Sequence, residues 1–191
     1  EGTSNVVFNG DDDQNLYTET FYSLTVNKPS GRVMMRPGST INTTSYTYIS
    51  GELLLTGAIF NIADLTNDGI YGTYRLESGE INLHQDSAGS IDLNANITMY
   101  DGAFRIYGGW SSCWFAGGGN ASLTMYGGTI DVVDQGIYIN NTGYAFESLI
   151  GGGTIRTSRS FVVGRPGFNP TNLIVELYGP ADAYVSTAEG S

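Results

Sequence analysis

The side chains that could act as nucleophiles or soft metal ligands are few and isolated. His84 is the single histidine and Cys113 the single cysteine among 191 residues. A lone histidine cannot build a histidine-based metal site or a Ser–His–Asp relay without partners that the sequence does not identify. Cys113 has no neighbouring cation in the sequence that would lower its thiol pKa and activate it. We therefore interpret both residues as structural.

Carboxylates are the only catalytic groups present in quantity, with 19 Asp and Glu. Asp11, Asp12 and Asp13 are consecutive, and Asp64 and Asp68 lie in a DLTNDG segment. Calcium loops need alternating ligands and a closing bidentate carboxylate, which neither segment has. We interpret both segments as solvated turns, and calcium binding at either remains an open alternative. The sequence predicts no cofactor.

Aromatic residues form a second group with functional potential. The candidates are Tyr100, Tyr126 and Tyr178, which precede predicted corners, and Trp110 and Trp114, in the long loop of residues 108–120. Flat exposed rings can stack on the faces of sugars, so these residues could form a glycan-binding platform. Alternatively, the tyrosine rings stack on one another as a ladder that stabilises a sheet, and the tryptophan loop covers the core.

The elements that must position these side chains are short strands. Residues 123–132 (LTMYGGTIDV) alternate apolar and polar side chains on each side of a Gly-Gly corner, as strands with one buried face do. The pattern recurs along the chain. Its corner residues are Gly51, Gly79, Gly102, Gly128, Gly153 and Pro180, at intervals of 23 to 28 residues. Such a period is typical of stacked repeats, whereas propeller blades need periods of about 40 or more.

Alignment on these corners predicts which side chains point inward, because successive strand residues face opposite sides. Three interior columns are predicted: Tyr48, Leu76, Met99, Met125, Ile150 and Leu177; Leu53, Ile81, Phe104, Ile130 and Ile155; and Leu55, Leu83, Ile106, Val132, Thr157 and Tyr184. A fourth column, predicted to point outward, contains Leu54, Asn82, Arg105, Asp131 and Arg156. Its last three members would form an exposed ladder of alternating charge.

These patterns predict an all-β fold, a single-stranded right-handed parallel β-helix of six to seven coils of about 25 residues. Residues 1–45 are expected to form N-terminal opening strands and a first coil, and residues 46–191 the regular coils of one continuous domain. The 27 glycines suit many tight corners, and no stretch has the 3.6-residue period of a helix.

The segments GGTIDVVDQGIYINNTG and GGGTIRTSRSFVVGRPG resemble the glycine-rich repeats of exported bacterial β-helix proteins. These are the autotransporter-passenger-like repeats common in PEP-CTERM-type surface proteins. The resemblance implies a β-helix, an extracellular or cell-surface location and an adhesive or scaffold role. It brings no catalytic motif. β-Helix enzymes that act on polysaccharides use carboxylates in a cleft between long loops, whereas the loops here are short.

Charge narrows the choice of partners. The net charge is −11, which disfavours nucleic acids and anionic membrane surfaces, and no apolar run is long enough to insert into a membrane. The chain begins with Glu1 rather than Met, which is expected for a processed exported protein and equally for a shortened chain. Glycans and other copies of the chain remain as possible partners.

Both ends of the predicted solenoid lack a visible cap, so each should expose strand edges and apolar core residues. The expected end residues are Val26, Val33 and Met35 at one end and Leu177 and Tyr184 at the other. We therefore expect a non-enzymatic, structural or adhesive element that associates head to tail with itself, or with adjoining solenoid domains. The alternatives are a carbohydrate-binding module that uses the exposed rings and, less favoured, a polysaccharide-active enzyme.

Overall fold

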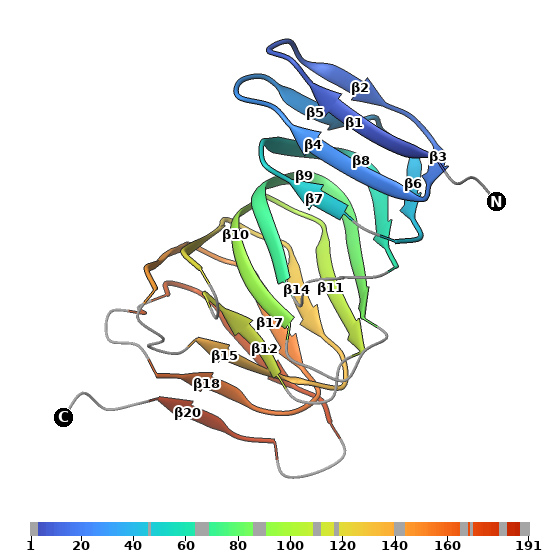
Figure 1. Cartoon of the computed structure of the whole chain (residues 1–191). Coiled ribbons are helices and arrows are strands. Elements are labelled where there is room, and N and C mark those ends of the chain that lie inside the picture. Colours follow the sequence, from blue (N-terminus) through green and yellow to red (C-terminus); the bar gives the residue numbers. More distant parts are fainter. Residues whose placement is uncertain are drawn as a thin grey trace.

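The computed structural model describes residues 4–45, 47–63, 69–85, 91–108, 112–116, 119–139, 144–164, 168, 170–179 and 183–187. These residues form a parallel β-solenoid with turns of roughly 23 residues and no helix, so the predicted fold class is confirmed. The two ends of the chain lie at opposite ends of the stack (Figure 1). Every strand pairing described is parallel.

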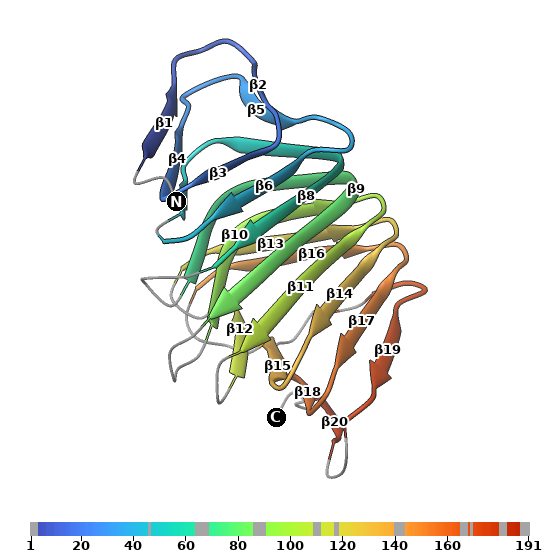
Figure 2. The same cartoon turned by 90° about the vertical axis from the view of Figure 1, so that its right-hand side faces the viewer.

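The strands stack in three sheets, because each full turn contributes a segment to each of them. Sheet one contains β2 (Gln14–Leu16), β5 (Arg32–Met35), the first part of β8 (Glu52–Ile62), the middle of β9 (Gly69–Gln85), the second half of β10 (Ile91–Met99), β13 (Ala121–Met125) and β16 (Phe146–Ile150). Sheet two contains β3 (Glu19–Phe21), β6 (Thr40–Thr43), the later parts of β8 and β9, β11 (Ala103–Gly108), β14 (Thr129–Val132), β17 (Thr154–Thr157) and β19 (Ile174–Leu177). Its strands form the regular row that faces the viewer in Figure 2.

Sheet three closes each turn. It begins with β1 (Asn5–Asn9), β4 (Ser23–Asn27) and β7 (Thr47–Ile49), which pair only with one another. It continues with the first residues of β9 and β10, β12 (Ser112–Phe115), β15 (Gly136–Ile139), β18 (Phe161–Val163) and β20 (Val185–Thr187).

The core consists of columns in which apolar side chains of successive turns lie on one another. The innermost column of sheet one contains Met35, Leu55, Leu76, Met99, Met125 and Ile150. The facing column of sheet two contains Phe60, Ile81, Phe104, Ile130 and Ile155. All of these side chains are buried, which confirms the predicted interior positions from Leu76 to Ile155. Period-two alternation therefore identified the buried face over the central turns.

Glycine makes the sharp corner between sheets one and two. Gly79, Gly102, Gly128 and Gly153 have φ values of 103°, 89°, 80° and 105°. A Cβ on Gly79 or Gly102 would clash with a backbone oxygen of the turn before it. Glycine is therefore required both for the positive φ and for the close stacking of the corners.

The predicted alignment is wrong at Gly51. Leu53 and Leu55 are buried, but they pair with Tyr74 and Leu76 of sheet one instead of lying on Ile81 and Leu83. β8 runs through the corner without a break, and Ala58 is the residue that pairs with Gly79.

The same misalignment reversed the residues beside Gly51. Tyr48, predicted to be inside, is 39% exposed, and its neighbour Ile49 is buried instead. Leu54 lies opposite Met34 and Arg75, so it does not belong to the outward column that contains Asn82.

The last predicted repeat is also out of register. β19 pairs with β17 in sheet two, so Leu177 lies beside Thr157 and is half-buried. Tyr184 is 53% exposed, in contrast to its predicted interior position. Pro180, the predicted corner, lies outside the described residues.

Candidate binding surfaces

The two isolated reactive residues have structural surroundings. His84 stacks on Tyr107 with ring centroids 4.7 Å apart. Cys113 is fully buried in sheet three, and burial raises the pKa of its thiol, with a further contribution from the charge of Asp92. A thiol with a raised pKa and no access to solvent is a poor nucleophile.

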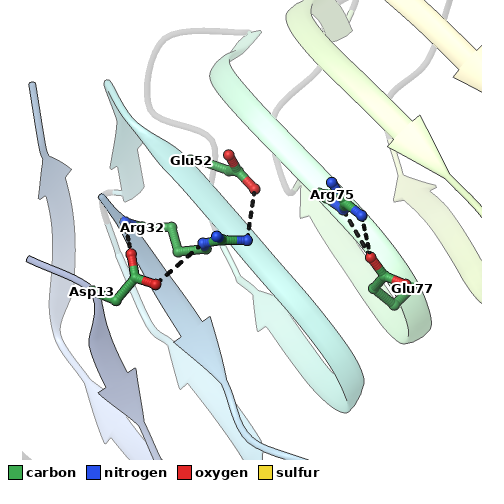
Figure 3. Close-up of polar contacts among 5 residues, drawn as sticks. All are labelled: Asp13, Arg32, Glu52, Arg75 and Glu77. Carbon is green, nitrogen blue, oxygen red and sulfur yellow. Dashed lines mark hydrogen bonds and ion pairs between the residues drawn. The ribbon is translucent and has the colours of Figure 1, made fainter. Parts of the chain in front are cut away.

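The acidic loop of the first turn is joined to the next two turns by an arginine. Arg32 Nε lies 3.4 Å from Asp13 Oδ2, and Arg32 Nη1 lies 3.8 Å from Glu52 Oε1 (Figure 3). Asp11 and Asp12 are exposed. Among the described residues, no group of three or more His, Cys, Asp or Glu side chains is placed to hold a metal ion. Asp64 and Asp68 lie outside that part of the chain.

Tyr100 and Tyr126 form a stacked pair at the corner between sheets one and two. Their ring centroids are 5.0 Å apart and their planes are inclined by 20°. The guanidinium of Arg75 lies 5.1 Å from the centroid of Tyr100, and Arg75 Nε donates to Glu77 Oε1 at 2.8 Å (Figure 3). The stack thus ends, toward the N-terminus, in a guanidinium held by a carboxylate.

Trp114 lies on another surface of the solenoid. It projects from β12 in sheet three and stacks on Tyr138 of β15, with centroids 4.8 Å apart and planes inclined by 26°. Trp110 lies outside the described residues. The pairing with Tyr138 was not predicted, although the separation of 24 residues, one turn, could have indicated it.

Tyr178 belongs to a polar cluster at the far end of sheet two. Its hydroxyl donates to Asp131 Oδ1 at 2.8 Å, and the guanidinium of Arg156 lies 4.9 Å from its ring centroid. Arg156 contacts carboxylates of both adjacent turns, with Nη1 3.4 Å from Asp131 Oδ2 and Nε 2.8 Å from Glu176 Oε2. Partial burial, followed by the hydrogen bond to Asp131, raises the pKa of Tyr178.

The predicted charge ladder therefore has the expected register but a different pattern of contacts. Arg105, Asp131 and Arg156 lie opposite one another on adjacent strands. Arg105 instead pairs with Glu80, its Nη1 lying 2.6 Å from Oε2. Asp131 is only 9% exposed, because it lies beneath Tyr178 and Arg156, so the ladder is not the open surface that was predicted.

The four predicted ring residues that the structure describes do not form one platform. Tyr100 and Tyr126 lie at the corner, Trp114 on sheet three, and Tyr178 after the last strand of sheet two. Each stacked pair has nearly parallel planes separated by about one turn, so the rings present edges to solvent and faces to each other. The mutual stacking corresponds to the ladder alternative.

The residues predicted at the N-terminal end are not at the surface. Val26, Val33 and Met35 are each at most 1% exposed, because β1 and β2 form a further turn over them. The half-buried apolar residues of that first turn are Val6 and Phe8. At the other end, Ile174 is 57% and Val185 56% exposed.

Two polar features were not predicted from the sequence. Lys28, the single lysine, is buried, with its ammonium 3.0 Å from Gln14 Oε1. Asparagines of sheet two form a ladder in which Asn82 donates to Asn61 at 2.9 Å and Asn61 to Asn42 at 2.8 Å. The Asn ladder was hidden by the misalignment at Gly51, which placed Leu54 rather than Asn61 beside Asn82.

Comparison with known proteins finds no matching protein family, no matching curated protein and no matching solved structure. The described residues include no helix that could cross a membrane.

Proposed function

We propose that this protein is a structural β-solenoid element of an exported, cell-surface protein and that copies of it associate end to end. The proposal rests on the unpaired edges of the terminal strands. Among the described residues, β1, β2 and β3 pair only with the following turn, and β19 and β20 pair only with the preceding one. The free edge of a strand offers N–H and C=O groups to another strand.

Apolar side chains lie beside these edges. Ile174 and Val185 are more than half exposed, and Val175 and Leu177 are half-buried. Burial of about 400 Å² of such surface would contribute about 10 kcal/mol before the costs of association. The two ends differ, so a contact between them is heterologous and propagates into a filament unless it closes into a ring.

Charge opposes this association at low ionic strength. The net charge is −11, and Asp11 and Asp12 are exposed in the first turn. Added salt screens such repulsion beyond about 10 Å at 0.1 M. End-to-end association should therefore strengthen as monovalent salt is added.

The extracellular location is supported by composition and by the likeness of the glycine-rich repeats to those of exported bacterial surface proteins. The chain contains 27 glycines and few charged residues. A long, regular solenoid is suited to an adhesive or scaffold role, and such a role requires no catalytic group. A longer solenoid built from adjoining units would use the same strand edges.

A single substitution can block pairing at the free edge of β19 with little effect on the pairing of β19 with β17. Ile174 and Tyr178 donate their N–H groups to the preceding turn, at Gly153 and Thr157. Because alternate residues of a strand direct their N–H groups to opposite sides, the N–H of Val175 points to the free edge. Proline at such an edge position removes a donor that the fold does not use.

We therefore expect the wild-type chain to sediment as species that grow with protein concentration and Val175→Pro to sediment as a monomer. Val175→Ala is the matched control, because it trims the side chain but keeps the N–H, and it should associate. Circular dichroism should show the same strand content for all three. A wild-type chain that remains monomeric at every concentration and salt level would exclude the proposal, as would association of Val175→Pro equal to that of Val175→Ala.

A further inference from the structure

Within the stacked ring pairs that the structure describes, Tyr126 has an outer face with no side chain opposite it. The described part of the chain has three stacked pairs on outward columns, Tyr100–Tyr126, Trp114–Tyr138 and His84–Tyr107. In such a pair, each ring covers one face of the other, so only the two outer faces of each pair remain.

Side chains of the adjacent turns lie opposite most of these outer faces. Asp92 is the partner of Trp114 and Val162 that of Tyr138. Arg75 covers Tyr100. Among the six rings of these pairs, Tyr126 alone has a glycine, Gly151, in the adjacent position of the next turn. The N–H of Gly151 donates to the Met125 carbonyl, as the N–H of Tyr126 donates to that of Met99.

The position beneath Tyr126 can accept a side chain. A Cβ on Gly151 would lie 3.8 Å from the Met125 carbonyl oxygen and 4.0 Å from Tyr126 Cδ1, both ordinary contacts, and the backbone there has no positive φ. The next turn places Thr171 at the same column, through a hydrogen bond from its N–H to Ile150. Two turns span about 9.6 Å, so the layer between Tyr126 and Thr171 has room for one ring. Tyr126 is 53% exposed.

The two ends of the tyrosine stack differ in charge. Arg75, Thr98, Thr124 and Leu149 occupy one outward column, and Glu77, Tyr100, Tyr126 and Gly151 the next. Toward the N-terminus the stack therefore ends in the Arg75–Glu77 ion pair. Toward the C-terminus, Leu149 occupies the column position that Arg75 has at the other end, and it is 60% exposed. Gly151 occupies the position that corresponds to Glu77.

We propose that the slot formed by Tyr126, Leu149, Gly151 and Thr171 binds one neutral pyranose ring of a glycan, with the C–H face of the sugar against Tyr126. An open tyrosine face beside an exposed leucine suits an apolar ring face. The net charge of −11 and the exposed Glu147 on the same strand disfavour anionic sugars. A guanidinium is disfavoured because the carboxylate that holds Arg75 over Tyr100 has no counterpart here. The site does not depend on end-to-end association.

The test uses saturation-transfer-difference NMR with cellohexaose, a neutral glucan whose equatorial substituents leave flat C–H faces. The wild-type chain should transfer saturation most strongly to the axial ring protons of the sugar. Gly151→Tyr should fill the slot with the chain's own ring, retain the thermal midpoint and lose the transfer. Tyr126→Ala should also lose it, whereas Tyr107→Ala, which opens a stack elsewhere, should keep it.

Three outcomes would overturn the proposal. The first is a wild-type chain that transfers no saturation to cellohexaose. The second is transfer that Gly151→Tyr leaves unchanged, which would place the sugar elsewhere. The third is transfer to N-acetyl-arginine amide and not to cellohexaose, which would make the slot a site for the arginine side chain of a protein partner.

Discussion

The hydroxyl of Tyr178 donates to Asp131 Oδ1 at 2.8 Å across 47 residues of sequence. Asp131 belongs to β14, β17 follows it in sheet two, and Tyr178 comes directly after β19. The bond thus spans two turns, with Arg156 between the partners and in contact with both. The final turn is attached by this cluster as well as by the backbone pairing of β19.

Removal of the hydroxyl should loosen the final turn. Tyr178→Phe keeps the ring over Arg156 but leaves Asp131, which is 9% exposed, with one hydrogen bond fewer. We expect a loss of about 1 kcal/mol in the free energy of unfolding, measured by urea denaturation. Tyr184→Phe is the control, because Tyr184 is 53% exposed, and it should leave stability unchanged. Equal effects of the two substitutions would show that the Asp131 contact contributes nothing.

Stability should fall at alkaline pH. Burial raises the pKa of Tyr74 and of Tyr178 above the ordinary tyrosine value, so the folded state favours the neutral phenol. The stabilisation is complete below the unfolded-state pKa of about 10 and is lost as pH rises above it. Urea denaturation between pH 8 and about pH 11 should show the decline, with a smaller slope for Tyr74→Phe. A free energy of unfolding independent of pH over this range would contradict the assigned burial.

The interior column of sheet one should not tolerate charge. Met125 is fully buried between Met99 and Ile150. Met125→Asp would place an unpaired carboxylate there, at a cost of about 3–5 kcal/mol. Thr124→Asp, one residue earlier on the outward side, should cost little. If both variants unfold at the same urea concentration as the parent, the assigned register of β13 is wrong.

The corner glycines should differ in their tolerance of a side chain. Gly153 has a φ of 105°, and a Cβ there would lie 3.0 Å from the Gly128 carbonyl oxygen. Gly153→Ala should therefore cost about 1–3 kcal/mol. Gly151→Ala, at a site with only ordinary contacts, should be neutral. The thermal midpoints of the two variants test this contrast, and a neutral Gly153→Ala would mean that the corner can relax.

The central turns could be predicted from the sequence because their side chains alternate strictly and their corners use glycine. From Leu76 to Ile155 the predicted interior side chains are buried. The prediction failed where the period changed. β8 turns its corner at Gly57 and Ala58, near Thr56, and no Gly-Gly pair marks this corner in the sequence. Gly51 has the sequence pattern of a corner, but it lies against Lys28 of the preceding turn. An alignment that uses one corner residue per repeat cannot follow a change in the position of the corner.

The aromatic contacts could be predicted only in part. Tyr100 and Tyr126 occupy one column of a correctly aligned repeat, so their stacking follows from register. The stacking of Trp114 on Tyr138 depends on sheet three, whose strands were not aligned column by column. Tyr178 contacts Asp131 across an intervening turn, and the pairing of adjacent strands does not predict a contact between residues two turns apart. The final turn was therefore both misaligned and assigned the wrong neighbours.

If the turns of one copy continue into those of the next, electron microscopy of the wild-type chain in moderate salt should show the continuous stack. We predict unbranched filaments with an axial rise of about 38 Å per subunit, since the eight described strands of sheet two stack at ~4.8 Å each. Val175→Pro should yield single particles under the same conditions. Isolated wild-type particles at every salt concentration, or filaments whose subunits meet side to side, would contradict end-to-end stacking of the turns.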